Sequence, residues 1–315
     1  MNVAVVGVGA VGSAVAELAD EHGHTVTALV DSSGAAVDSG GLDVTAALDR
    51  KNETGAVGDA DPDRLDAVAH DVLVEATPTT LGDAQPGFGR VEAALERDRN
   101  VVLANKGPVA ERYGDVRALA AESEGEVRFE ATVGGAIPVL STIEDVGPAQ
   151  ITAVRGVLNG TANFILSRMA AEGLAYEHVL AEAQDLGVAE TDPSFDVEGT
   201  DAALKCVIVA HVLADGREYT LADATVEGIR DLPTGALELA AETNRTIRLV
   251  GEVQNGAVRV APRLVPENGA MAVTGTQNIV QFETRHAGSL YHSGRGAGGP
   301  ETASAIFADI NRLDG

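Results

Sequence analysis

MNVAVVGVGAVGSAVAELADEHG, residues 1–23, contains an apolar strand, a glycine-rich turn and an amphipathic helix in direct succession. The glycines have the GxGxxG spacing: Gly7 allows a tight turn, Gly9 lets the backbone approach a pyrophosphate, and Gly12 permits close packing of helix on strand. The spacing alone is a weak signal, but the flanking strand and helix are the context that it requires. The sequence therefore predicts dinucleotide binding by the turn residues Gly7, Val8, Gly9, Ala10, Val11 and Gly12.

The next strand, TVTALVDSS (residues 25–33), places an acidic residue shortly after the glycine-rich helix. Asp31 stands where a carboxylate binds the hydroxyls of the adenosine ribose in folds of this kind. The alternative is a turn residue after a strand, which is a common place for aspartate.

A long connection rich in Gly, Asp and Ser follows, with a helix-like piece around residues 43–51. Apolar strands and amphipathic helices then alternate as far as the predicted strand EVRFEAT, residues 126–132. This alternation favours an α/β fold with a doubly wound parallel sheet of Rossmann type. Ligands bind at the carboxyl ends of such strands. Four residues at predicted strand ends are therefore expected along the nicotinamide half of a bound dinucleotide: Thr77, Pro78, Ala104 and Lys106.

A second informative stretch is GVAETDPSFDVEGTDAALK, residues 187–205, which holds five acidic residues and a lysine between two helical patterns. Asp201 and Lys205 are four residues apart at the start of a predicted helix, so they share one face and can reach each other. Pro193 and Gly199 interrupt regular structure. We therefore expect Glu190, Asp192 and Asp196 to lie on a loop that aims carboxylates at a polar ligand. The alternative is an acidic first turn that is stabilised by the helix dipole.

The composition is strongly acidic: 48 acidic residues against 22 basic ones give a formal net charge of -26. Such a field repels nucleic acid and anionic membranes. Only three of the basic residues are lysines, a pattern similar to that of salt-accumulating halophiles. No apolar run is long enough to span a membrane and no signal peptide is evident, so we expect a cytoplasmic protein. The single Cys206 excludes an internal disulfide framework.

The character of the sequence changes after Glu130. Apolar segments at 247–265 and 278–293 alternate as antiparallel strands do, and they follow helical patterns, which indicates a second, α+β domain. The sequence therefore predicts two domains of different architecture.

Six motifs now carry a resemblance: the chain resembles homoserine dehydrogenases, in the short form without a regulatory domain, over essentially its whole length. Six motifs in the order of the family are far more specific than any one of them. They are GVGAVG (7–12), LANKGP (103–108), EATVGGAIPVL (130–140), RGVLNGTANFIL (155–166), the acidic stretch 187–205 and GRGAGGPETA (294–303).

The resemblance implies an NAD(P)-dependent oxidoreductase that interconverts L-homoserine and L-aspartate 4-semialdehyde in threonine, methionine and isoleucine biosynthesis. It implies that Lys205, with Lys106 as second candidate, handles the proton at the substrate oxygen. Glu190 and Asp201 would hold the amino group, supported by Asp196, and the other substrate residues would be Gly160 and Thr161. Gly187 and Gly298 would border the nicotinamide.

The same resemblance implies a monovalent cation, Na⁺ or K⁺, bound by Glu130 and the backbone carbonyls of Val133, Gly135 and Ile137. Oxygen ligands suit a hard cation, although a glycine-rich hinge is the alternative. The resemblance also implies a homodimer. It implies a dinucleotide-binding domain formed by both chain ends, residues 1–130 plus 295–315, and a catalytic and dimerisation domain of residues 131–294 between them. Asp31 favours NAD over NADP, whereas Lys51 could fold back and offset the repulsion of the 2′-phosphate, as in some members of this branch. We therefore expect both cofactors to bind.

The chemistry of the residues agrees with an alcohol dehydrogenase. Oxidation of an alcohol needs hydride transfer to nicotinamide and a positioned group that takes the hydroxyl proton. An acylating aldehyde dehydrogenase would need a nucleophilic cysteine, and Cys206 points about 100° away from Lys205 on the helix. A nucleotide-sensing regulator remains the alternative from another class; it would bind cofactor without turnover.

Overall fold

The computed structural model describes residues 1–62, 65, 69–214 and 216–313. The chain divides into two compact units, one formed by Met1–Ala136 with Gly298–Gly315 and the other by Ile137–Ala297. We call them the N/C unit and the middle unit. The sequence placed these boundaries after residues 130 and 294, so the observed ones lie six and three residues further along the chain.

The N/C unit contains a six-stranded sheet whose strands run parallel except at one edge. The doubly wound α/β fold predicted from the alternation is confirmed. The edge strand β3 is antiparallel to β2, and it lies in the connection for which the sequence predicted no strand. In spatial order the strands are β3 (Ala35–Val37), β2 (Thr25–Val30), β1 (Asn2–Val6), β4 (Val72–Glu75), β5 (Asn100–Leu103) and β6 (Val127–Arg128).

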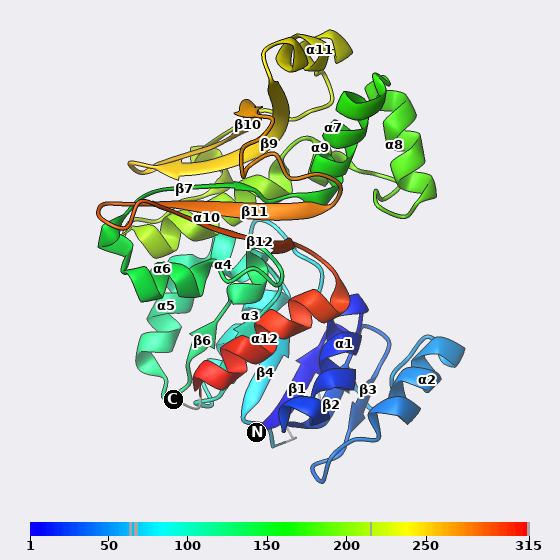
Figure 1. The fold of residues 1–315 in the computed structure, drawn as a ribbon. Helices are drawn as coiled ribbons and strands as arrows, with labels where there is room; N and C mark the ends of the chain where they lie inside the picture. Colours follow the sequence, from blue (N-terminus) through cyan, green and yellow to red (C-terminus); the bar gives the residue numbers. More distant parts are fainter. Residues whose placement is uncertain (63–64, 66–68, 215, 314–315) are drawn as a thin grey trace. The chain divides into compact units, whose positions relative to one another are not determined.

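The helices α1 (Ala10–Leu18) and α12 (Gly299–Leu313) lie side by side over the sheet, although they come from opposite ends of the chain (Figure 1). The core that they share with the strands includes Val5, Val15 and Phe307, all fully buried. The remaining helices of this unit are α2 (Val44–Thr54), α3 (Gly87–Leu95), α4 (Gly107–Glu111) and α5 (Tyr113–Glu122), with 3₁₀ turns at Asp20–His22 and Glu130–Thr132.

The middle unit has a six-stranded, mostly antiparallel sheet, which agrees with the α+β pattern predicted for this part of the chain. Its outer pair β10 and β8 is parallel. The spatial order is β12 (Ser289–Arg295), β11 (Gln277–Thr284), β7 (Ile151–Val157), β9 (Arg245–Gln254), β10 (Ala257–Pro266) and β8 (Ala224–Val226).

One helix of the middle unit is buried along nearly its whole length. In α10 (Thr200–Leu213) every residue from Asp201 to His211 is buried, and the helix packs on β9 and β10. The other helices are α6 (Leu140–Val146), α7 (Gly160–Glu172), α8 (Tyr176–Asp185), α9 (Ser194–Val197) and α11 (Thr234–Glu242), with 3₁₀ turns at Pro148–Gln150 and Leu221–Asp223.

Two local predictions need correction. Asp196 was expected on a loop, but it belongs to the short helix α9, where Pro193 fixes the first turn. The predicted strand EVRFEAT is a strand only at Val127–Arg128, because the chain then turns into the 3₁₀ helix Glu130–Thr132.

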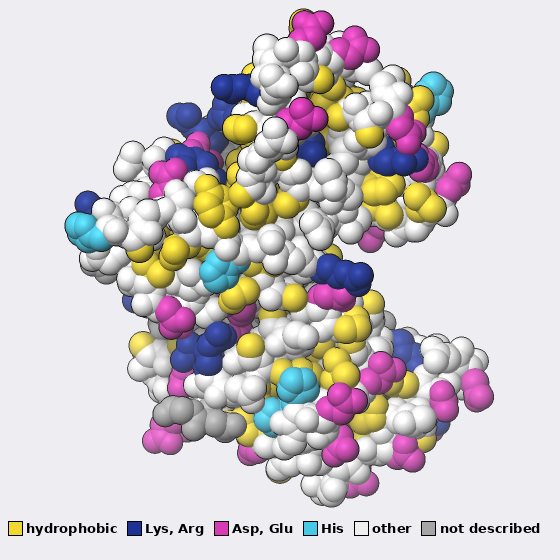
Figure 2. All heavy atoms as spheres, in the orientation of Figure 1, with side chains coloured by type: hydrophobic (Ala, Val, Ile, Leu, Met, Phe, Trp, Pro, Cys, Tyr) yellow, Lys and Arg dark blue, Asp and Glu magenta, His cyan; other side chains and the backbone are white. Residues whose placement is uncertain are grey.

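The acidic side chains are spread over the surface, as the acidic composition leads one to expect (Figure 2). On the face drawn in Figure 2, acidic side chains are scattered among uncharged ones and do not gather in one patch. Among the described residues, none of the helices has both the length and the apolar composition needed to cross a bilayer.

Candidate active site

The glycine-rich turn between β1 and α1 is shaped by three glycines with different surroundings. Gly7 has φ +93°, and a Cβ atom on it would lie 2.5 Å from the backbone of Ala76. A Cβ atom on Gly12 would lie 2.0 Å from the carbonyl oxygen of Gly7, so α1 approaches β1 too closely for any side chain there. Gly9 has no heavy atom within 4 Å of its Cβ position. The turn is therefore closed on the protein side and open at Gly9, where a phosphate would approach the N-terminus of α1.

The start of α12 lies beside the same turn. A Cβ atom on Gly299 would lie 2.6 Å from the carbonyl oxygen of Ala10, the first residue of α1. Gly298 has φ +129° and accepts a hydrogen bond from the N–H of Thr302 at 3.0 Å. Two helix N-termini with partly positive ends thus begin next to each other, which suits an anionic pyrophosphate.

Asp31 has the environment of a turn residue, which was the alternative in the sequence, and it also contacts Lys51. Its Oδ1 accepts from the N–H groups of Ser33 at 2.8 Å and Gly34 at 3.0 Å, as a turn residue does. Its Oδ2 accepts from Lys51 Nζ at 2.9 Å. The pKa of Asp31 is lowered, because these hydrogen bonds and the charge of Lys51 outweigh the opposing effect of burial. Lys51, on α2, does fold back onto this carboxylate.

The carboxyl ends of β4 and β5 are joined by a side chain that the sequence analysis missed. Glu75, the last residue of β4, is fully buried, and its Oε1 accepts from the N–H of Thr77 at 3.0 Å and from the Thr77 hydroxyl. Asn105 also donates to Glu75, and the N–H of Lys106 donates to Thr79 Oγ1 at 3.4 Å. A carboxylate that ends an otherwise apolar strand, VLVE, was the available signal.

In the middle unit the predicted pair of Asp201 and Lys205 forms within α10. Lys205 Nζ donates to Asp201 Oδ2 at 2.7 Å and to the carbonyl oxygen of Leu158 at 2.6 Å. Both side chains are more than nine-tenths buried. An ammonium group has three N–H donors, so one remains for a ligand oxygen. The arrangement presents a fixed proton donor beside a carboxylate.

Asp196 and Thr161 join the same cluster. Asp196 is hydrogen-bonded to the Thr161 side chain and accepts from Asn159. The pKa of Asp196 is raised, mainly by burial and further by the negative charge of Asp201, against the hydrogen bond from Asn159. Thr161, in the first turn of α7, also donates to the carbonyl oxygen of Val188 at 3.0 Å, which ties this helix to the acidic stretch.

Asn159 is a second residue that the sequence analysis did not single out. It caps α7, because its Oδ1 accepts from the N–H of Ala162 at 2.8 Å. Its Nδ2 donates to Asp196 Oδ1 at 2.6 Å and to Asp201 Oδ2 at 2.9 Å, so one amide holds two carboxylates together. Its position before Gly160, at a helix start, is a typical capping signal, but the link to residues some forty positions away is not visible in the sequence.

Glu190 and Gly187 lie on the exposed part of the acidic stretch. The Glu190 backbone carbonyl accepts from Gln184 Nε2 at 3.0 Å, and its side chain is exposed. Gly187 ends α8 with φ +69° and has open space at its Cβ position. The structure therefore holds the backbone at Glu190 and leaves its carboxylate to solvent.

Cys206 is unsuited to nucleophilic chemistry. The thiol is buried, and burial raises its pKa to about 12, so the thiolate is absent at neutral pH. The structure thus supports the choice of a dehydrogenase with an amine at its centre over one with a catalytic cysteine.

The segment predicted to bind a cation, residues 130–137, offers only oxygen atoms as ligands. Glu130 is buried, its N–H donates to Asp309 Oδ2 at 2.7 Å, and Gly134 and Gly135 follow with φ of +85° and +57°. Within the described parts of the chain, no group of three or more His, Cys, Asp or Glu side chains could hold a metal ion. One carboxylate with several carbonyl oxygens fits a hard monovalent cation better than a transition metal.

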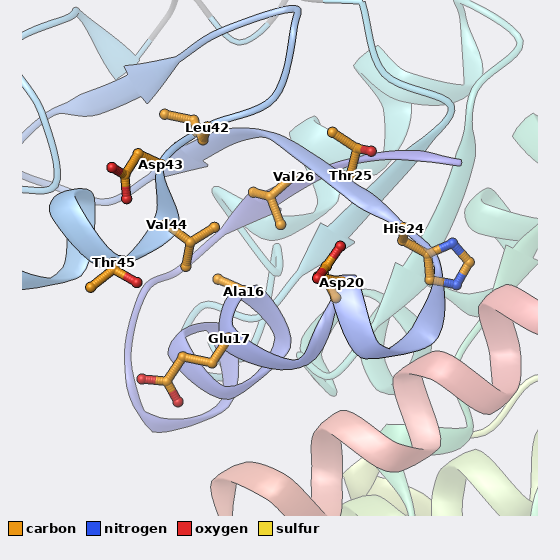
Figure 3. Close-up of a pocket in the computed structure, with 11 residues that line it drawn as sticks. Ala16, Glu17, Asp20, His24, Thr25, Val26, Leu42, Asp43, Val44 and Thr45 are labelled. Atoms are coloured by element: carbon orange, nitrogen blue, oxygen red, sulfur yellow. The ribbon is translucent and has the colours of Figure 1, made fainter.

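A groove of about 540 Å³ lies elsewhere on the N/C unit (Figure 3). It runs along the end of α1, the start of β2 and the start of α2, and the carboxylates of Glu17, Asp20 and Asp43 line it. This is the amino end of β2, whereas ligands of parallel sheets bind at carboxyl ends. Its acidic lining would also repel a pyrophosphate.

Comparison with known proteins now bears on these two sites. A model of the homoserine dehydrogenase family matches residues 138–310, more than half of the chain. The homoserine dehydrogenase of Methanocaldococcus jannaschii is 39% identical, and the alignment covers 98% of this chain and 97% of that protein. This chain belongs to the homoserine dehydrogenase family.

Other members of the homoserine dehydrogenase family agree in fold and differ in cofactor. A protein from Archaeoglobus fulgidus assigned to the family has a TM-score of 0.92 at 40% identity, with 99% of each chain covered. A hyperthermophilic archaeal homoserine dehydrogenase solved with NADPH has a TM-score of 0.86 at 28% identity, with 99% of this chain and 97% of that one covered. An NAD⁺-dependent relative from Pseudomonas canavaninivorans is 36% identical, over 76% of this chain and 70% of that protein.

The family assignment confirms the predicted fold class and the predicted enzyme class, an NAD(P)-dependent oxidoreductase that acts on a CH–OH group. A model of the glutamate/leucine/phenylalanine/valine dehydrogenase family matches residues 1–81 only, within the N/C unit. That match covers the glycine-rich turn and does not extend to the cluster around Lys205.

Proposed function

We propose that this chain catalyses the NAD(P)-dependent interconversion of L-homoserine and L-aspartate 4-semialdehyde. The observation that carries the proposal is the buried cluster of Lys205, Asp201, Asp196 and Asn159. It combines a fixed ammonium group with carboxylates, as a substrate with both a reacting oxygen and a cationic amino group requires. The sum of the reaction is homoserine and NAD(P)⁺ giving semialdehyde, NAD(P)H and a proton.

Lys205 is the proposed proton carrier at the substrate oxygen. Two of its N–H donors are directed to Asp201 and Leu158, so the third has a defined direction for a substrate oxygen. Lys205 donates a proton to the substrate oxygen in aldehyde reduction and takes the hydroxyl proton in alcohol oxidation, and Asp201 holds its amine in place at 2.7 Å. Lys106 is the second candidate for this role.

The substrate amino group is assigned to carboxylates of the acidic stretch. Asp201 and Glu190 are its proposed partners, and Asp196 supports Asp201 through Asn159. Gly160 and Thr161, at the start of α7, complete the substrate residues. The exposure of Glu190 leaves its carboxylate available for such a contact.

The dinucleotide is assigned to the N/C unit, and Gly187 stays a predicted cofactor residue from the family resemblance. The turn Gly7–Gly12 and Gly298, which precedes α12, suit the pyrophosphate, and Asp31 with Lys51 suits the adenosine ribose in either its free or its phosphorylated form. When bound, the nicotinamide accepts or supplies the hydride. The proposed residues beside it are Thr77, Pro78, Ala104 and Lys106.

We also propose a homodimer, a cytoplasmic location, an acidic surface adapted to high salt, and a place in threonine, methionine and isoleucine biosynthesis. The proposed site of a monovalent cation is formed by Glu130, Val133, Gly135 and Ile137.

The test is a steady-state assay at 340 nm with L-homoserine and either NAD⁺ or NADP⁺ in molar potassium chloride. The proposal predicts homoserine-dependent reduction of at least one cofactor, and the reverse reaction with L-aspartate 4-semialdehyde. Cofactor binding without turnover in either direction would show a nucleotide-sensing protein and refute the proposal.

A further inference from the structure

Four hydrogen-bond donors from three segments of the N/C unit meet on the buried carboxylate of Glu75. Arg90 of α3 donates to Oε2 at 3.1 Å. On the other oxygen, Oε1, the N–H of Thr77 donates at 3.0 Å, the Thr77 hydroxyl donates as well, and the amide of Asn105 donates at 3.4 Å. The Glu75 side chain has no exposed surface, whereas Arg90 is partly exposed, so the carboxylate is shielded from water on its own side of each contact.

This arrangement sets the direction of the Thr77 hydroxyl. A hydroxyl has a single proton, and the hydrogen bond from Thr77 Oγ1 to Glu75 Oε1 uses it. Asn105 Nδ2 donates to the Thr77 oxygen at 3.2 Å and occupies one of its two lone pairs. One lone pair of Thr77 remains, and it can only accept. Any ligand group that binds this oxygen must therefore be a hydrogen-bond donor.

Glu75 also holds the turn that carries Lys106. Its backbone carbonyl accepts from the N–H groups of Ala104 at 2.9 Å and Asn105 at 3.2 Å. Asn105, bonded to the Glu75 side chain, in turn accepts from the N–H of Gly107 at 2.9 Å through its own Oδ1. The main chain on either side of Lys106 is thus attached to one residue of β4.

Stability gives little reason for a charged pair at this place. An apolar pair of similar volume is often as stable as a buried ion pair, or more stable, because two charges need not be desolvated. What an apolar pair would lack is an acceptor for Thr77 and Asn105.

We propose that Glu75 is a positioning residue for the nicotinamide half of the bound dinucleotide. It orients the Thr77 hydroxyl as an acceptor for a donor of the cofactor, such as the carboxamide NH₂ or a ribose hydroxyl, and it fixes the turn that bears Lys106. The inference rests on the dinucleotide site proposed above.

Two double variants separate this role from a merely structural one. Glu75→Gln/Arg90→Met and Glu75→Met/Arg90→Met both remove the ion pair and leave no buried charge unpaired. They differ at position 75. The side-chain amide of the first variant keeps a carbonyl oxygen that can accept from Thr77 and Asn105, and no arginine competes for that oxygen, whereas the second variant has no acceptor there. The dissociation constant for NADPH, read from the fluorescence of the reduced nicotinamide, and the melting temperature without cofactor are measured for each.

We expect the first variant to bind NADPH within about threefold of wild type and the second about tenfold or more weakly, since one hydrogen-bond acceptor is lost. Thr77→Val, which removes the hydroxyl, should weaken NADPH binding similarly. Thr77→Ser keeps the hydroxyl and should bind NADPH as the wild type does. Glu126→Gln, which removes a surface ion pair with Arg128 in the same unit, is the control and should change neither quantity. Equal NADPH affinities of the two double variants, or wild-type affinity of Thr77→Val, would overturn the inference.

NADPH binding is measured without turnover, so the result does not depend on the substrate. A wild-type protein that binds NADPH and fails to oxidise homoserine would refute the proposed function and leave this comparison intact. A wild-type protein that binds neither NADPH nor NADH would overturn both, and for a protein that binds only NADH the same comparison is made with NADH fluorescence.

Discussion

Alanine at two glycines of the same turn should affect two different properties of the protein, cofactor binding and stability. Gly9→Ala should weaken dinucleotide binding with little change in stability, whereas Gly12→Ala should destabilise the fold. The difference follows from what a Cβ atom would meet: no heavy atom within 4 Å at Gly9, and the carbonyl oxygen of Gly7 at 2.0 Å from Gly12.

The size of each effect can be worked from these surroundings. Non-bonded atoms pack at about 3.5 Å, so alanine at Gly12 must push α1 away from β1 by more than about 1 Å. Overpacking typically costs about 1–3 kcal/mol, and a clash between two backbones belongs at the upper end, a loss of several degrees in Tm. The backbone of Gly9, with φ -87° and ψ -159°, accepts alanine, and a poorer helix cap costs about 1 kcal/mol or less.

Binding at Gly9 is affected because the new methyl group occupies the space through which a phosphate reaches the backbone. The loss of one charge-assisted hydrogen bond, about 1.5–3 kcal/mol, weakens binding roughly 10- to 150-fold. Thermal unfolding without ligand measures stability, and NADPH fluorescence titration measures cofactor affinity. Unchanged NADPH affinity of Gly9→Ala would refute the placement of the pyrophosphate, and a wild-type Tm of Gly12→Ala would refute the packing.

Lys205→Arg keeps the charge but cannot shuttle a proton, so it should lose most of kcat while NADPH still binds; more than about a tenth of wild-type kcat would rule out the proton role. Lys106→Arg should change the KM of cofactor and substrate as well as the rate. Lys51→Ala removes the cation beside Asp31 and should weaken NADP⁺ more than NAD⁺ in equilibrium titrations, and an equal loss for both would exclude a contact with the 2′-phosphate. The net charge of -26 should make the protein more stable in molar salt, where the Debye length falls from about 10 Å at 0.1 M to about 3 Å at 1 M; equal Tm values in 0.1 M and 2 M potassium chloride would contradict this. Cys206, with its raised pKa, should react with a thiol reagent at pH 8 only after denaturation, and fast labelling of the native protein would show that the helix opens.

Local patterns predicted the parts of the fold that depend on near neighbours. The glycine spacing placed the turn before α1, and the interval of four residues paired Asp201 with Lys205, because both follow from the geometry of one helix and its entry. Lys51 was expected to fold back and offset the repulsion between Asp31 and a 2′-phosphate, an expectation that drew on the family resemblance, and its contact with Asp31, twenty positions earlier, is seen in the structure.

The residues that were missed act over longer distances. Asn159 joins Asp196 and Asp201 across 37 and 42 positions, and Glu75 joins Asn105 across 30. In sequence each reads as a helix cap or as the end of a strand. Their role arises only when tertiary packing brings three segments together, and no periodic pattern in the sequence predicts such a contact.

The origin of α12 at the far end of the chain has a consequence for synthesis. Ile306, Phe307 and Ile310 complete the core of the N/C unit, yet they are synthesised after the whole of the middle unit, residues 137–297. The middle unit is continuous in sequence and can fold first, whereas the strands of residues 1–136 must wait with apolar surface uncovered. The N/C unit is thus begun first and completed last. Of the two units, it exposes apolar surface for longer during synthesis, so we expect it to depend more on chaperones or on fast elongation.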